Sequence, residues 1–256
     1  MKKAVCRVLK KGSGVWALLF WLGVWQAASM ILDSQILLVS PIRAAATLFR
    51  LMGEKGFYLS VATSVSRILT GFLWACLMAV ILSALSARFG WARALMGPFM
   101  QAVKATPVAS FVILALLLFS SRRLSTFMSF LMALPILYAN TLSGFESVDK
   151  KLLEMADIFH LNRLERARCL YVPAAFPYFL SGCTVAMGTC WKAGVAAEVI
   201  GLPSGTIGEK LYQAKIFLDT PELFAWTLAV ILISLALEKA VLGLMRLFRR
   251  RMGGET

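Results

Sequence analysis

The sequence is poor in the residues that build catalytic and metal-binding sites. Its 256 residues include a single histidine, His160, and only 13 acidic residues. The five cysteines are an odd number and form no Cys-x-x-Cys pair. A serine–histidine–acid triad, a zinc site and a disulfide framework are therefore not expected. We predict no catalytic residue and no metal site in this chain.

A phosphate-binding loop is missing as well. Residues 201–210 read Gly-Leu-Pro-Ser-Gly-Thr-Ile-Gly-Glu-Lys, which is superficially similar to one. However, Glu209 interrupts the Gly-Lys step that places a lysine on the phosphates, and no buried strand precedes the segment. We therefore expect this chain neither to hydrolyse ATP nor to hold a cofactor.

Charged residues are scarce too. They make up 16% of the chain, whereas 59% of its residues are hydrophobic; a soluble domain carries about a quarter charged residues. The net charge of +14 is compatible with nucleic-acid binding, but the basic residues lie at the ends of apolar runs and form no patch interleaved with aromatics. The composition favours a membrane protein that contacts lipid, with no nucleic-acid partner.

Six apolar runs are long enough to cross a bilayer, which takes about 20 residues of helix. They are residues 15–32, 59–85, 95–119, 124–144, 177–200 and 223–247. The first follows a basic start and resembles a signal peptide, but its length favours an uncleaved span. We predict an all-α integral membrane protein of six transmembrane helices in one domain, 1–256. Residues 1–58 hold the first span and an outer interfacial segment, 59–247 a five-helix core, and 248–256 a basic tail.

Basic residues orient the predicted spans. In a six-span arrangement the basic segments 1–11, 88–93, 150–168 and 246–251 share one side, which the positive-inside rule makes the cytoplasm. Both termini are then cytoplasmic. Arg122 and Arg123, in a short outer loop, are a mild exception.

Several shorter features carry their own signals. Residues 41–52 predict an interfacial helix, and a short amphipathic helix is expected between Gly208 and Asp219, where Asp219 or Thr220 would cap the last span. Prolines 98, 107 and 135 suggest bends within the spans. Residues 146–168 are charged and amphipathic, which fits either two short helices with a break at 160–162 or a plain solvated hairpin.

A motif lies within that last segment. Glu154-Met155-Ala156, three residues, His160, nine residues and then Leu170-Tyr171-Val172-Pro173 resembles the EAA loop of binding-protein-dependent ABC transporter permeases. That loop reads Glu-Ala-Ala, three residues, Gly, nine residues, Ile-x-Leu-Pro, and the spacing here matches throughout. The resemblance extends from about Ser64 to the C-terminus and is strongest to nitrate-, sulfonate- and taurine-type permeases.

The resemblance implies a type I ABC importer permease of the bacterial inner membrane, with a cytoplasmic coupling helix between its fourth and fifth spans. Its implied partners are ATPase subunits that bind ATP and Mg, a second permease copy in a homodimer, and an extracytoplasmic solute-binding protein. Because His160 stands where the family has glycine, we expect the turn to differ locally, or His160 to contact the ATPase. The residues expected at this ATPase contact are Leu153, Glu154, Met155, Ala156, Asp157, Phe159, His160 and Arg163.

Ionisable residues inside spans are costly and point to functional sites. Lys104, Trp191, Lys192 and Glu198 are our candidates for the substrate pathway, where a lysine would attract an anion. The alternative is structural: either lysine pairs with Glu198 or with carbonyl groups near Pro107. Lys192 and Glu198 are six residues apart, so they lie on different faces of one helix.

The cargo implied by the resemblance is a small oxyanion such as a sulfonate, taurine or nitrate. A pyrimidine precursor of thiamine, or another small nutrient, is the alternative within the same family. A six-span secondary transporter, independent of ATP, is the alternative outside it, although such a protein has no need of an EAA-type loop. The missing catalytic residues disfavour a membrane-embedded enzyme.

Overall fold

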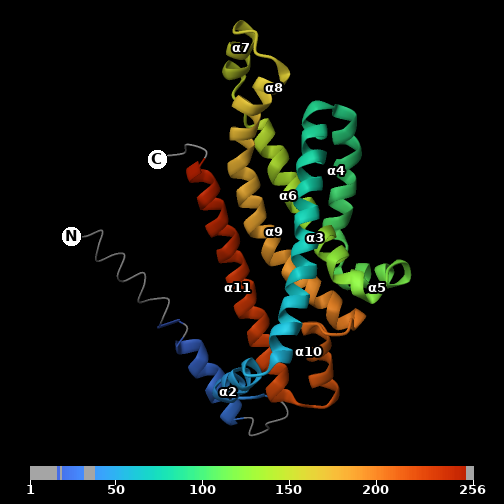
Figure 1. The fold of residues 1–256 in the computed structure, drawn as a ribbon, viewed down its shortest axis with the longest axis vertical. Helices are drawn as coiled ribbons and strands as arrows, with labels where there is room; N and C mark the ends of the chain where they lie inside the picture. The colour runs from blue at the N-terminus through green and yellow to red at the C-terminus, as the bar shows by residue number, and fades with distance from the viewer. Residues whose placement is uncertain (1–15, 18, 32–37, 252–256) are drawn as a thin grey trace, which may run out of the picture. The chain divides into compact units, whose positions relative to one another are not determined.

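The computed structural model describes residues 16–17, 19–31 and 38–251, with side chains up to Leu244, and these residues are overwhelmingly helical (Figure 1). A short apolar helix, Leu19–Ile31, comes first. The helices that follow are α2 (Pro41–Met52), α3 (Lys55–Arg88), α4 (Gly90–Ala105), α5 (Val108–Leu118), α6 (Ser121–Glu146), α7 (Lys150–Ile158), α8 (Arg163–Arg166), a π-helical turn (Ala167–Tyr171), α9 (Val172–Gly201), α10 (Ile207–Ile216) and α11 (Thr220–Arg251).

Four of these helices are long and apolar enough to cross a membrane: α3, α6, the continuous helix from Arg163 to Gly201, and α11 over Thr220–Leu244. A fifth candidate is the pair α4 and α5, which meet at an angle of 106°. The all-α membrane fold is thus confirmed with four or five spans. The ends of the predicted first span, 15–32, lie outside the described residues. Its helix Leu19–Ile31 is shorter than a span of about 20 residues.

The predicted span 95–119 is bent at Pro107, as the sequence suggested. It is divided between α4 and α5 at Thr106, whose backbone is extended (φ −79°, ψ 131°) as expected for a residue that precedes proline. Pro107 therefore marks a real break. By contrast, Pro98 and Pro135 lie inside the continuous helices α4 and α6.

The chain divides into two compact units, residues 1–58 with 210–231 and residues 59–209 with 232–256. In the first unit the helix predicted at 41–52 is confirmed as α2, which Ser40 caps and Pro41 begins; its place at the membrane interface stays a prediction. The indole of Trp25 donates a hydrogen bond to the carbonyl oxygen of Val39 at 3.0 Å. Asp219 accepts from the amide of Glu222 at 3.0 Å, which confirms the predicted cap of α11.

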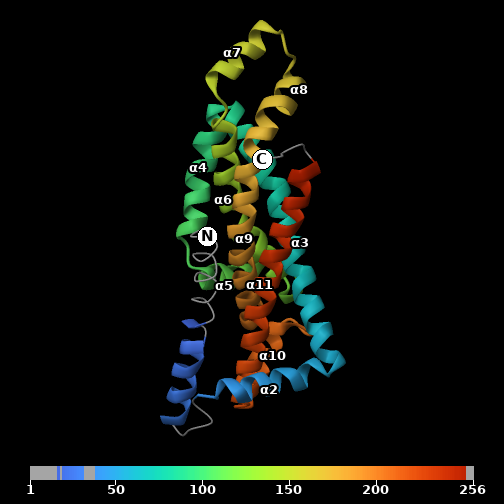
Figure 2. The ribbon, with the colours of Figure 1, turned by 90° about the vertical axis from the view of Figure 1, so that its left-hand side faces the viewer.

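The second unit is built around α6 and α9, which lie side by side along their length (Figures 1 and 2). Glycine permits this approach: a Cβ on Gly144 would lie 2.6 Å from Cα of Ala175. A Cβ on Gly194 of α9 would likewise lie 2.6 Å from side-chain atoms of Ile68 on α3 and of Ser129 on α6. Helices α3, α6 and α9 therefore meet closely in the middle of this unit.

Candidate functional site: the α7–α8 segment and the helix it drives

The α7–α8 segment, residues 149–166, joins α6 to the long helix Arg163–Gly201. Asp149 caps the start of α7 by accepting from the amide of Lys151 at 3.0 Å. Helix α7 ends at Ile158 and α8 begins at Arg163. Two short helices with a break at 160–162 are thus confirmed, and the plain hairpin is not what the segment forms.

His160 ends α7 with a left-handed backbone, at φ 51°. The amide of His160 donates to the carbonyl oxygen of Asp157 at 3.1 Å, and that of Leu161 donates to Ala156 at 3.0 Å. These two bonds form the Schellman turn in which helices commonly end, usually with glycine at the left-handed position. The expectation that histidine changes the turn is wrong, because His160 adopts the positive φ itself.

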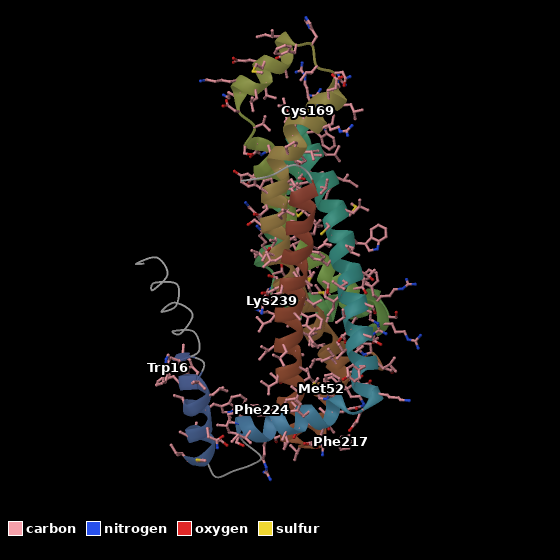
Figure 3. The ribbon with its side chains drawn as sticks, turned by 60° about the vertical axis from the view of Figure 1, so that its left-hand side comes forward. Trp16, Met52, Cys169, Phe217, Phe224 and Lys239 are labelled. Atoms are coloured by element: carbon pink, nitrogen blue, oxygen red, sulfur yellow. The ribbon has the colours of Figure 1, made fainter. Side chains whose placement is uncertain are left out.

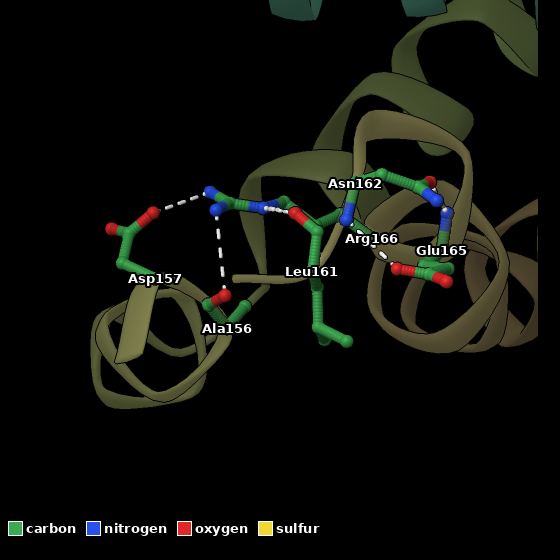
Figure 4. A network of polar contacts seen from close by, with 6 residues as sticks. All are labelled: Ala156, Asp157, Leu161, Asn162, Glu165 and Arg166. Carbon is green, nitrogen blue, oxygen red and sulfur yellow. Dashed lines mark hydrogen bonds and ion pairs between the residues drawn. The ribbon is translucent and has the colours of Figure 1, made fainter. Parts of the chain in front are cut away.

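Arg166 joins the two helices across this turn (Figure 4). Its Nε donates to the carbonyl oxygen of Leu161 at 2.9 Å, and one terminal nitrogen donates to that of Ala156 at 3.4 Å. The guanidinium also pairs with the carboxylate of Asp157 at 2.6 Å. Arg166 thereby links residues at the end of α7 to the chain that follows the turn.

Asn162 and Glu165 fix the start of α8 in the same region (Figure 4). The side-chain oxygen of Asn162 accepts from the amides of Leu164 and Glu165, and the Glu165 carboxylate accepts from the amide of Asn162 at 2.8 Å. This reciprocal arrangement is a capping box. The segment therefore has a defined shape rather than that of a solvated linker.

The exposed face of α7 is apolar. Met155 is 52% exposed, Phe159 69% and Ile158 74%. Glu154, Asp157, His160 and Arg163 are exposed around them, and Leu153 is half-buried. Ala156 is only 2% exposed, so in this chain it packs inward and offers no surface to a partner.

The sequence analysis did not include two exposed apolar residues of the segment, Ile158 on this face and Leu164 on α8. Leu164 is 78% exposed on α8. Ile158 follows Met155 by three residues, a spacing that places both on one side of α7 and could have identified it.

The π-helical turn Ala167–Tyr171 continues α8 into α9, so α8, this turn and α9 form one helix of 39 residues, Arg163–Gly201. Figure 3 shows Cys169 where this helix leaves the α7–α8 segment. A π turn is a local widening that is frequent at functional sites. Helix α8 therefore runs into α9 without a break.

The pathway candidates divide into two pairs by burial. Lys104 of α4 and Lys192 of α9 are exposed, whereas Trp191 and Glu198 are fully buried within the chain. Glu198 accepts a hydrogen bond from Ser64 of α3 at 2.7 Å. In the described part of the chain the ion pairs join Arg93 to Glu146 and Arg166 to Asp157, so neither lysine pairs with Glu198 there.

Residues 63–254 match the family described as "Binding-protein-dependent transport system inner membrane component". Three curated relatives are named for the transport of taurine, nitrate and bicarbonate. The taurine transport system permease TauC of Escherichia coli is 25% identical over 88% of this chain and 83% of its own length. The nitrate import permease NrtB of Leptolyngbya laminosa is 24% identical over 70% and 67%. The bicarbonate transport permease CmpB of Synechococcus elongatus is 24% identical over 60% and 55%.

Two solved structures share the fold. One is an amino acid ABC transporter crystallised with histidines, with a TM-score of 0.59 and 15% identity over 77% of this chain and 93% of that one. The other is a bacterial ABC transporter for import of the acidic polysaccharide alginate, with a TM-score of 0.54 and 13% identity over 94% and 98%.

Proposed function

Since this chain belongs to the family of binding-protein-dependent transport system inner membrane components, it is the membrane-spanning permease subunit of an ATP-driven importer, and we propose that its cargo is a small oxyanion. The chain is a transport subunit and not an enzyme. Its family works with a separate ATPase and a solute-binding protein at the inner membrane.

The docking surface for the ATPase is the exposed face of α7. Three apolar side chains, Met155, Ile158 and Phe159, are exposed to solvent. They belong to a segment whose two helices both have capped N-termini. A cluster of exposed apolar residues within a charged rim is the pattern of a protein contact. Glu154, Asp157, His160 and Arg163 form that rim, and Leu153 and Ala156 support it from below.

The cargo class rests on chemistry shared by the relatives and on two lysines. Taurine carries a sulfonate, and nitrate and bicarbonate are small oxyanions themselves. Lys104 and Lys192 are exposed on membrane helices of this chain, where an unpaired cation is costly unless it faces a polar path. We place both on the pathway, and leave out Trp191 and Glu198 because neither has surface that a solute could touch.

The complete importer holds two copies of this chain, each embedded in lipid with six spans and both termini in the cytoplasm. A homodimer places α9 and its Lys192 from each copy around one path. ATP and Mg bind to the partner ATPase, which leaves this subunit without a cofactor of its own.

Uptake of labelled solutes tests the cargo. Proteoliposomes hold this chain and its ATPase, and receive its solute-binding protein outside and ATP inside. We expect ATP-dependent uptake of taurine, an alkanesulfonate, nitrate or bicarbonate, and none of a neutral hydroxymethyl pyrimidine. Uptake of the pyrimidine alone would replace the oxyanion with a thiamine precursor as cargo.

A further inference from the structure

Glu198 lies at the end of α9 that is farthest from the α7–α8 segment. Between Val172 and Glu198 the helix rises by about 40 Å, at about 1.5 Å per residue. Glu198 has no exposed surface, and neither does Ser64 of α3, whose hydroxyl donates to Oε2 of Glu198 at 2.7 Å. A buried carboxylate is retained in a membrane helix only where donors surround it.

The same pair holds the first turn of α10. The amide of Ile207 donates to the hydroxyl oxygen of Ser64 at 3.0 Å, and the amide of Gly208 donates to Oε2 of Glu198 at 3.4 Å. Thr206 accepts from the amide of Glu209 at 3.2 Å. Three of the four amides that a helix leaves free at its start are thus satisfied, two of them by residues of α3 and α9. The negative carboxylate also suits the positive end of the α10 dipole.

Gly208 makes this arrangement possible. A Cβ at Gly208 would collide with the backbone and Cβ of Glu198. The loop before α10 turns through two residues with left-handed backbones, Leu202 at φ 49° and Gly205 at φ 73°. The first turn of α10 is therefore seated on α9 through backbone contact, and Ser64 and Glu198 hold it there. We name Ser64, Glu198 and the first turn of α10 the Glu198 latch.

The other oxygen of Glu198 has a different environment. Oε1 is buried without a hydrogen-bond partner among the described residues, and so are one terminal nitrogen of Arg67 and the hydroxyl oxygen of Ser125. Arg67 on α3 lies close enough to act on this carboxylate electrostatically, and the hydroxyl of Ser125 on α6 lies within hydrogen-bonding reach of it. Unpaired buried polar atoms are rare and costly, so three of them around one carboxylate require an explanation.

We propose that Ser64 and Glu198 are positioning residues of the transport cycle, forming a latch with two positions. In this structure Glu198 and Ser64 hold the start of α10. When α9 moves, the carboxylate exchanges the α10 amides for Arg67 and Ser125, whose donors are already near. The exchange keeps the charge satisfied in both positions, which is what a switch between two packed states requires.

The latch lies on the helix that starts at the ATPase contact. Because Arg163–Gly201 is one continuous helix, closure of the ATPase on α7 reaches Glu198 through α9. Only this step, in which closure of the ATPase reaches α9, rests on the proposed docking of α7. The latch converts a movement of α9 into release or capture of the first turn of α10, at the opposite end of the span.

Variants of Ser64 test the proposal in the reconstituted transporter. Ser64→Ala removes the hydroxyl that bridges Glu198 to Ile207, and Ser64→Thr keeps it. We expect Ser64→Ala to lower uptake per ATP hydrolysed at least tenfold, with ATPase copurification and ATP hydrolysis within twofold of the wild type. We expect Ser64→Thr to restore uptake. Unchanged uptake per ATP in Ser64→Ala overturns the proposal, and so does a parallel loss of uptake and hydrolysis in an assembled complex, which indicates a merely structural role. Failure of the wild-type chain itself to copurify with the ATPase would instead contradict the docking surface.

A second measurement leaves Ser64 and Glu198 intact. Thr206 is fully buried beside the latch, so a Thr206→Cys substitution, in a chain whose own cysteines are replaced, reports its opening through maleimide labelling. We expect labelling to become at least fivefold faster during ATP turnover than without nucleotide. The added change Arg67→Met, which removes the second position, should abolish that acceleration. Equal labelling rates in the two conditions, or acceleration that survives Arg67→Met, overturns the two-position latch.

Discussion

The guanidinium of Arg166 donates to the carbonyl oxygen of Leu161 at 2.9 Å, across the turn where α7 ends. The same side chain pairs with Asp157, so it ties the docking surface to the start of the long helix. The α7–α8 segment is consequently not a loose loop attached to a span, since its α8 continues directly into α9.

Replacing Arg166 tests that connection. Arg166→Met removes the bond to Leu161 and the ion pair with Asp157. The side chain is 29% exposed, so solvent weakens its charge-assisted bonds. We expect the substitution to lower the local stability of the turn by about 1 kcal/mol. Hydrogen exchange of residues 156–161 should accelerate about fivefold and uptake should fall. Arg168→Met, an exposed arginine two residues on, is the control and should leave both unchanged. Equal exchange in the two variants would show that Arg166 does not hold the turn.

Replacing His160 with glycine should stabilise the same turn, whereas Arg166→Met should destabilise it. A left-handed backbone costs about 1 kcal/mol in any residue with a Cβ, and glycine avoids that cost. His160→Gly should therefore slow hydrogen exchange at the end of α7 and keep uptake at the wild-type level. His160→Val, with a β-branched side chain, should do the reverse. If His160→Gly keeps its turn but loses uptake, the imidazole itself contacts the ATPase.

The contact of α6 with α9 depends on Gly144. An alanine Cβ there would lie 2.6 Å from Cα and 3.1 Å from the carbonyl oxygen of Ala175, and backbone atoms cannot move aside. We expect Gly144→Ala to cost about 1–3 kcal/mol of unfolding free energy, the usual penalty of overpacking. Gly243→Ala, in the exposed interior of α11 with nothing within 4 Å, should be neutral or gain up to about 1 kcal/mol. Thermal unfolding in detergent compares the two; equal midpoints would contradict the close approach.

Lys192 carries the proposed attraction for the anion. Lys192→Gln should raise the half-saturation concentration of uptake several-fold and reduce its dependence on salt, with ATPase binding unchanged. Lys55→Gln, at the exposed start of α3, is the control. Identical salt dependence of uptake in both variants would remove Lys192 from the pathway.

Much of the fold follows from local sequence signals. The apolar pattern of residues 41–52 predicts the helix α2 correctly, and Asp219 predicts the cap of α11, because these signals act within a few residues. The break at Thr106 needs more than a local signal. Of the three prolines expected to bend a span, only Pro107 marks a break, whereas Pro98 and Pro135 lie inside continuous helices.

The site is predictable in its position and less so in its geometry. The EAA-type spacing locates the α7–α8 segment, and the six-residue separation of Lys192 and Glu198 correctly assigns them to different faces. The roles of Ser64 and Gly208 escape sequence reasoning. Both are ordinary residues whose importance comes from contacts 134 and 10 residues away in the chain, with Glu198. His160 shows the converse, since the turn persists although its usual glycine is absent.

ATP dependence of uptake tests the central claim most directly. Proteoliposomes are prepared with this chain and its solute-binding protein, with and without the ATPase subunit and ATP. We predict uptake of the labelled oxyanion only when all components are present. Glu154→Arg, which reverses a charge on the rim of the docking surface, should abolish uptake without affecting insertion. Uptake by the chain alone, without ATP or the ATPase, would contradict the account and identify a secondary transporter.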